Sequence, residues 1–210
     1  LVPLQVNSDA QVLFHSSFTS NVQFIEYIMA SFAQHAPVDS TLVIKQHPMD
    51  RGYQDYAKLI TARTKDLELQ GRCIYIHDQS LPELLQNARG VVVINSTVGL
   101  SALHHGVPLK VCGKSIYDLA GLTFQGTLDH FWKGANKCKP DSHLLQCFNG
   151  YLVRYTQFNG NFYKRVQKDL SATGISWKSK QGLMDVNDYS LDRQSTIATD
   201  NYYIHWYGYI

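Results

Sequence analysis

Apolar residues follow two alternating patterns along the first 120 residues of the chain. Short, mainly apolar runs predict β-strands, and they lie at residues 1–6, 11–14, 41–45, 73–76, 91–94 and 109–111. Between several of these runs, apolar residues recur at a spacing of three and four, which predicts amphipathic helices at residues 21–35, 53–69, 81–88 and 98–105. Because strands and helices alternate, we expect an α/β fold with a doubly wound parallel sheet that is covered by helices on both faces.

The alternation fades after about residue 120. Residues 142–157 predict one further helix, with its apolar side chains on one face. From residue 159 onward the chain is rich in Tyr, Asn, Ser and Asp without a readable period, and its aromatic close, NYYIHWYGYI, fits either a strand or a packed tail. We therefore expect a folded domain at residues 1–160 and a C-terminal extension at residues 161–210.

Two of the predicted strands end abruptly in residues that can contact an anion. The first is in TLVIKQHPMD at residues 41–50, and the second is in GVVVINSTVGLSAL at residues 90–103. Ligands of open α/β sheets bind beyond the carboxyl ends of the strands, where the following helices begin and their N–H groups favour negative charge. The two strand ends together predict a site for a phosphorylated ligand.

His47 directly follows the first of these strands and precedes Pro48. Proline removes a backbone donor and fixes φ, so it ends strand pairing and turns the chain out of the sheet. An imidazole presented there can donate to a phosphate oxygen or stabilise charge on a leaving group. Lys45, two residues earlier, is expected on the same side as His47. A simple strand cap is the alternative interpretation.

The second strand end brings an amide and two hydroxyls to a strand-to-helix junction, as Asn95, Ser96 and Thr97. Either hydroxyl could cap the helix or donate to a phosphate, and Gly99 would allow a ligand or backbone to approach closely. The chain contains neither a G-x-x-x-x-G-K-[ST] nor a G-x-G-x-x-G sequence. The junction is therefore no standard nucleotide motif, and a plain helix cap remains the alternative.

Composition narrows the classes of function. A net charge of +2 gives no electrostatic case for nucleic acid. The four cysteines lack paired spacing and no complete set of metal ligands is visible, so we expect neither a metal nor a cofactor and a reducing compartment. No apolar run approaches the ~20 residues of a membrane span.

Three longer segments resemble the capsule polysaccharide biosynthesis/export family of the KpsS/LipB type: VIKQHPMDRGYQDY, YIHDQSLPELLQNARGVVVINSTVGLSALHHGVPLKVCG and IYDLAGLTFQGTLDHFW. The resemblance covers residues 1–160 and implies a Rossmann-like, nucleotide-sugar-binding half of a GT-B-like glycosyltransferase. It implies transfer of β-linked Kdo from CMP-Kdo to phosphatidylglycerol, a lipid acceptor, in the cytoplasm or on the inner face of the bacterial inner membrane. A capsule export ABC transporter and a companion Kdo transferase are its implied partners.

Under this resemblance, His47 and Pro48 contact the phosphate of the donor, and Ser96 and Thr97 form the second phosphate-contacting element. Lys45, Asn95 and Gly99 are neighbours added from their position. Members of the family are longer than this chain, which resembles their C-terminal, donor-nucleotide half. The acceptor site and an acidic nucleophile are expected in the other half, so this chain alone should be inactive.

Two other functions are compatible with the sequence. A non-catalytic export factor could bind the glycolipid and pass it to a transporter, and the aromatic C-terminal residues would suit that role. A sugar-nucleotide epimerase of similar fold would need paired carboxylates near His47, which the sequence does not show. Preference for one nucleotide would distinguish a transferase from an export factor.

Overall fold

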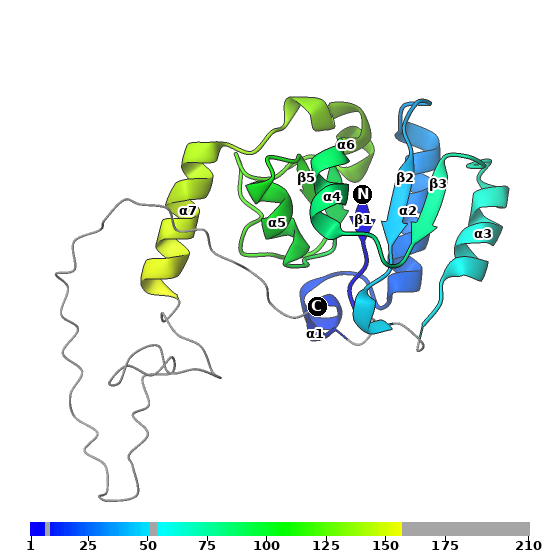
Figure 1. Cartoon of the computed structure of the whole chain (residues 1–210), viewed down its shortest axis with the longest axis horizontal. Coiled ribbons are helices and arrows are strands. Elements are labelled where there is room, and N and C mark those ends of the chain that lie inside the picture. The colour runs from blue at the N-terminus through cyan, green and yellow to red at the C-terminus, as the bar shows by residue number, and fades with distance from the viewer. Residues whose placement is uncertain (7–8, 51–53, 157–210) are drawn as a thin grey trace, which may run out of the picture. The chain divides into compact units, whose positions relative to one another are not determined.

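The chain folds as an α/β domain, and its computed structural model describes residues 1–6, 9–50 and 54–156. The expected extension at residues 161–210 lies outside the described residues. The strands are β1 (Val2–Pro3), β2 (Leu42–Lys45), β3 (Cys73–Ile76), β4 (Val91–Val93) and β5 (Leu109–Val111). The α-helices are α1 (Ala10–His15), α2 (Asn21–His35), α3 (Ala57–Asp66), α4 (Leu81–Asn87), α5 (Val98–His104), α6 (Leu128–Gly134) and α7 (Ser142–Tyr155). Residues Leu1–Phe148 form one compact unit, shown in Figure 1.

The strands form two parallel ladders, β1-β2-β3 and β4-β5. Leu1 joins them, because its carbonyl accepts from the Val92 N–H (2.9 Å) and its nitrogen donates to the Gly90 carbonyl (2.9 Å). The order in space is therefore β3-β2-β1-β4-β5, which is the order of a Rossmann-like sheet. The expectation of a doubly wound parallel sheet is confirmed.

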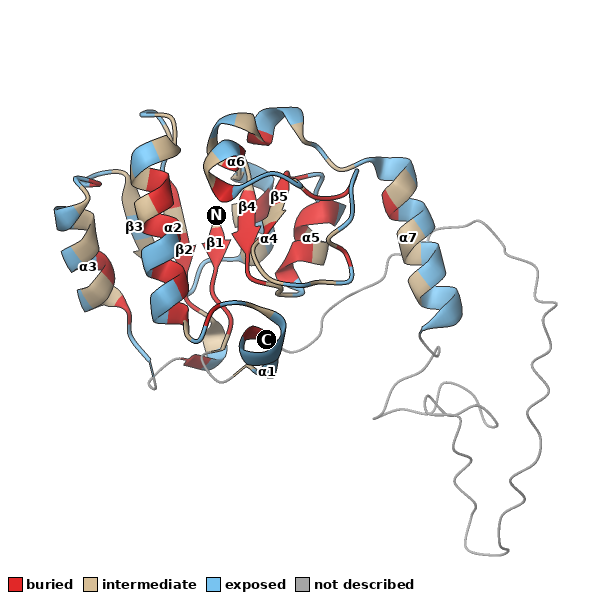
Figure 2. Cartoon of the chain, turned by 180° about the vertical axis from the view of Figure 1, so that it is seen from behind, coloured by how far each residue is buried: buried red, intermediate tan, exposed pale blue. Residues whose placement is uncertain are grey.

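Strand β4 shows why helices are needed on both faces of the sheet. Its side chains alternate, so that Val92 packs in the cluster around α2 while Val91 and Val93 pack in the cluster around α4 and α5. All three are fully buried, and Figure 2 shows the strand in the colour of buried residues. A parallel strand that is covered on both faces consists of consecutive apolar residues, which explains the sequence GVVVI.

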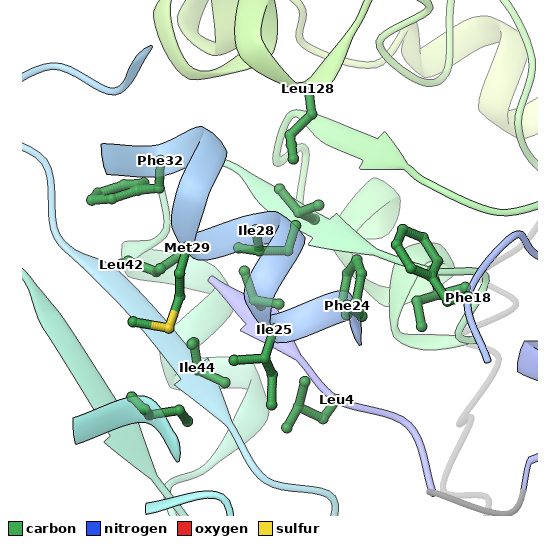
Figure 3. Packing of buried hydrophobic residues seen from close by; sticks show 14 of the residues in the cluster. Leu4, Phe18, Phe24, Ile25, Ile28, Met29, Phe32, Leu42, Ile44 and Leu128 are labelled. Atoms are coloured by element: carbon green, nitrogen blue, oxygen red, sulfur yellow. The ribbon is translucent and has the colours of Figure 1, made fainter. Parts of the chain in front are cut away.

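Helix α2 supplies the largest share of the core on its face. Ser20 caps its start by accepting from the Gln23 N–H, and the helix ends at His35, before Pro37, as predicted. Its inward side chains are spaced by three and four residues and are almost completely buried (Figure 3): Phe24, Ile25, Ile28, Met29 and Phe32. At about 25 cal/mol per Å² of apolar surface, burial of this stripe is a main source of folding free energy.

The prediction of a strand at residues 11–14 is wrong, because this segment is helix α1. The Asp9 carboxylate caps the helix by accepting from the Gln11 N–H (2.8 Å). Only Val12 of this helix is buried, whereas Phe14 remains 78% exposed. Short apolar runs cannot be assigned to strand or helix by periodicity alone, and Asp9, directly before this run, is the capping residue in the sequence that favours a helix.

Elsewhere the predicted elements agree with the structure. Helix α4 carries its proline in the first turn, α5 is closed by Gly106 at a positive φ of 67°, and α7 occupies the predicted segment. Within the described part of the chain, no helix combines the length and the apolar character that crossing a bilayer requires.

Two phenylalanines offer a matched test of this core. Phe24→Ala removes a ring that is 0% exposed and should lower the free energy of unfolding by about 3–5 kcal/mol. Phe14→Ala should change it by no more than about 0.5 kcal/mol. Urea denaturation measures both values, and equal losses in the two variants would contradict the assignment of α2 as a core helix.

Candidate functional site

The predicted site residues gather at one edge of the sheet. His47 follows the end of β2 and Asn95 follows the end of β4, while β1 lies between these two strands. Figure 1 shows α1 and the short 3-10 helix η1 (Pro48–Asp50) beyond this edge. The chain reverses its direction across the sheet between β1 and β4, and Rossmann-like sheets bind their ligands at such a switch point. Neighbouring strands are about 4.8 Å apart, so the two strand ends are separated by roughly 10 Å.

The imidazole of His47 is half-buried and has a defined hydrogen-bonding state. Its Nδ1 accepts from the Met49 backbone N–H (3.2 Å), which can only donate, so a neutral ring carries its proton on Nε2. Burial lowers the pKa of His47 and the Lys45 charge lowers it further, whereas Asp50 and Asp9 raise it. With its pKa below the ordinary value of 6.5, the ring is mainly neutral at pH 7 and offers Nε2–H as a donor.

Gln46 organises the loop that carries His47. Its side chain is 4% exposed, and its Nε2 donates to the carbonyls of Gln54 (2.5 Å) and Asp50 (3.4 Å). Its backbone N–H donates to Ile76 of β3, which extends the ladder by one residue. Gln46 was not among the predicted site residues, although a glutamine directly after a buried strand is a signal that the sequence contains.

Lys45 is buried and bonded to backbone carbonyls at the end of β2. Its side chain is 7% exposed, and its Nζ donates to the carbonyls of His77 (3.1 Å) and Gln46 (3.4 Å). The ammonium therefore ties together the segments that follow β2 and β3. It still acts on His47 through its charge, but its hydrogen bonds are made within the protein.

The two hydroxyls at the start of α5 differ from each other. Ser96 is half-buried and its Oγ accepts from the Val98 N–H (3.2 Å), so it serves the helix as a cap. Thr97 is exposed and makes no side-chain bond to the helix. The capping alternative thus describes Ser96, and the Thr97 hydroxyl is the one presented to solvent.

Gly99 is required by a neighbouring side chain. A Cβ at this position would lie 2.6 Å from ring carbons of Tyr117, whose hydroxyl donates to the Ser96 carbonyl. Burial raises the pKa of this phenol to about 12, so it remains a donor at neutral pH. The close approach expected at Gly99 is therefore made by Tyr117, which holds the Ser96 backbone in place.

Asn95 uses its side chain to hold helix α1 against the sheet. Its Nδ2 donates to the carbonyls of Gln11 (2.8 Å) and His15 (3.3 Å), and its Oδ1 accepts from the amide of Gln5 (3.0 Å). The amide is thus engaged with protein groups rather than directed at a ligand. Gln5, at the end of β1, is a second site residue that the sequence analysis missed.

Sequence comparison connects the chain to proteins of capsule biosynthesis. Residues 1–163 match the family described as capsule polysaccharide biosynthesis protein. The capsule polysaccharide modification protein LipB of Neisseria meningitidis is 47% identical over 79% of this chain, and the capsule polysaccharide export protein KpsS of Escherichia coli is 48% identical over 78%. The matches cover 39% of LipB and 41% of KpsS, so the chain spans about two fifths of the length of these relatives.

Two solved structures are similar to part of the fold. The β-Kdo 2,7 transferase KpsC of Thermosulfurimonas dismutans is 25% identical, with a TM-score of 0.42 over 64% of this chain and 43% of that one. HepE of Anabaena, solved in complex with UDP, is 18% identical, with a TM-score of 0.41 over 74% of this chain and 39% of that one.

The contact between Gly99 and Tyr117 leads to a stability prediction. Gly99→Ala should lower the free energy of unfolding by about 1–3 kcal/mol, because a new methyl overlaps the Tyr117 ring. Combining it with Tyr117→Ala should cost less than the sum of the two single changes. Gly150→Ala in α7, where a Cβ meets nothing within 4 Å, is the control and should not destabilise. Additive losses in urea denaturation would show that the two residues do not compete for space.

The lowered pKa of His47 predicts a pH dependence of stability. Because the folded-state pKa is below the unfolded value of 6.5, protonation favours the unfolded chain, and stability is lost as the pH falls through 6.5. In His47→Asn, the free energy of unfolding should therefore fall less between about pH 7.5 and pH 5.5. His104, whose pKa burial also lowers, contributes equally to both proteins. Parallel pH profiles of the variant and the parent protein would contradict this environment for His47.

Proposed function

Because the chain belongs to the capsule polysaccharide biosynthesis protein family, we propose that it is the donor-binding part of a capsule glycosyltransferase. The donor is CMP-Kdo and the acceptor is phosphatidylglycerol, a lipid on which the polysaccharide is then exported. The observation that carries this proposal is the position of the His47 ring at the carboxyl edge of a Rossmann-like sheet, where its Nδ1 accepts from the Met49 N–H and leaves Nε2 to act as a donor.

The phosphate of the donor has two kinds of partner at this edge. His47 offers a ring N–H beyond β2, and Thr97 offers an exposed hydroxyl beyond β4, while Ser96 shapes the turn. Helix α5 has only seven residues, so we assign the contact to side chains rather than to its dipole. Pro48 starts the 3-10 turn whose Met49 N–H fixes the ring of His47.

These donors supply what departure of a nucleotide needs. As the bond from the sugar to the phosphate breaks, negative charge grows on the phosphate oxygens, and donors already in place stabilise it without reorganisation. A single phosphate carries little charge compared with a diphosphate, so hydrogen bonds replace the metal that many nucleotide-sugar enzymes use. The nucleophile and the acceptor site belong to the part of the relatives that this chain does not span.

The acceptor implies a place of action. A phosphatidylglycerol acceptor is reached from a protein that lies peripherally on the inner face of the bacterial inner membrane. There the enzyme would work with a companion Kdo transferase and pass its product to a capsule export ABC transporter.

A second candidate function is non-catalytic export. The name of the relative KpsS, a capsule polysaccharide export protein, favours it. An export factor that recognises glycolipid has no reason to distinguish CMP from UMP or AMP, whereas the donor site of a transferase does. Nucleotide selectivity therefore separates the two functions.

Calorimetric titration of the chain with CMP, UMP and AMP tests the proposal. We expect CMP to bind best, and His47→Ala and Thr97→Val each to weaken CMP binding at least about tenfold, or 1.4 kcal/mol. His130→Ala, at an exposed histidine of α6, is the matched control and should bind as the parent protein does. In the complete enzyme, loss of one donor should slow turnover by about 10²–10³. Equal affinity for the three nucleotides, or undiminished CMP binding by His47→Ala, would exclude the proposed site.

A further inference from the structure

Side chains join β1 to β4 at the edge of the sheet where the donor would bind. We call this contact between residues 1–5 and residues 90–95 the seam. Among the described residues, the backbone hydrogen bonds between these segments are those of Leu1 to Gly90 and Val92. The Leu4 N–H points to β2, where it meets the Lys45 carbonyl (2.9 Å). The preceding residue therefore faces β4, but it is Pro3, which has no N–H to give. Pro3 therefore donates no bond to β4, and among the described residues no backbone hydrogen bond continues the ladder toward the carboxyl edge.

Gln5 continues the seam with its amide group. Its Oε1 accepts from the Asn95 backbone N–H (3.2 Å), and its Nε2 donates to the Asn95 Oδ1 (3.0 Å). The same Nε2 donates to the Asp9 Oδ2 (3.0 Å). Gln5 is 5% exposed, so these bonds are made where an unsatisfied amide would be costly.

We propose that Gln5 and Asn95 are positioning residues, whose paired amides hold Asp9 and helix α1 between the strand end that carries His47 and the strand end that carries Thr97. This inference deepens the proposed function, because the groups that are positioned belong to its donor site. Gln5 and Asn95 themselves need not touch the donor.

Helix α1 depends on these bonds for its place. Val12 is its one buried residue, so apolar packing fixes it weakly. Polar contacts hold it instead: Asp9 caps its start, Asn95 donates to the carbonyls of Gln11 and His15, and the Lys114 N–H also donates to the His15 carbonyl (2.7 Å). In this arrangement the Asp9 carboxylate interacts electrostatically with His47, as Asp50 and Lys45 also do.

A double-mutant cycle on the titration of His47, followed by NMR without ligand, tests the positioning role. Asp9→Asn should lower the titration midpoint of His47, because it removes a carboxylate that stabilises the imidazolium. In a Gln5→Met background the same change should have at most half that effect, because Asp9 is no longer held in place. If Gln5→Met does not fold, Gln5→Asn keeps the amide on a side chain one methylene shorter. An equal effect of Asp9→Asn in both backgrounds would overturn the proposal.

Donor binding gives a second readout. Gln5→Met should weaken CMP binding about tenfold. The matched control is Gln125→Met, which removes amide bonds to Asp118 and Thr123 in another loop and should leave CMP binding unchanged. Undiminished CMP binding by Gln5→Met would also overturn the proposal. If the parent protein binds no CMP, the proposed function fails, and the ligand-free titration of His47 still decides the role of Gln5.

Discussion

The fold depends on one seam, the contact between the N-terminal strand and β4. Leu1 joins the two ladders through its backbone, and Gln5 joins them through its side chain. Without this seam, β1-β2-β3 with α2 and α3 would be one half-sheet, and β4-β5 with α4 and α5 another. Because the chain changes direction across this same seam, the contact that unites the sheet also creates the switch point where a ligand can bind.

The distribution of buried polar groups marks this edge as different from the rest of the interior. Five of the seven buried polar residues of the described chain lie at or near the carboxyl ends of β1 and β2: Gln5, Asn21, Lys45, Gln46 and Asp50. Among the described residues, the Asn21 Oδ1 has no hydrogen-bond partner, although its Nδ2 donates to the carbonyl of Gln5 and to Tyr56. Burying a polar group costs free energy unless it is hydrogen-bonded. We therefore expect a cluster of buried polar residues where their hydrogen bonds hold loops in a defined position. Here it fixes the loops that carry His47 and Asp9.

The sequence predicted the repeating architecture because burial on two faces leaves a strong pattern. The run GVVVI and the three-four spacing of α2 both follow directly from the layers they pack between. The prediction failed at residues 11–14, where the apolar run is too short to show a period and where Asp9 caps a helix. The locations of His47 and Thr97 were predicted at strand ends, yet the partners of Lys45 and Asn95 were not. Those partners are backbone carbonyls and an amide distant in sequence, which no local pattern specifies.

The electrostatics of the edge indicate how it could select an anion. Asp50 and Asp9 raise the pKa of His47, whereas Lys45 lowers it. The ammonium of Lys45 is itself bonded to backbone carbonyls. The described groups that act on His47 thus carry charges of both signs, so directed donors at short range contribute more here than attraction at a distance. Such donors act only if they are held at the correct spacing before the ligand arrives. In the proposed site, the polar seam at Gln5 and Asn95 is therefore as important as the groups assigned to the phosphate, because it would hold them at that spacing.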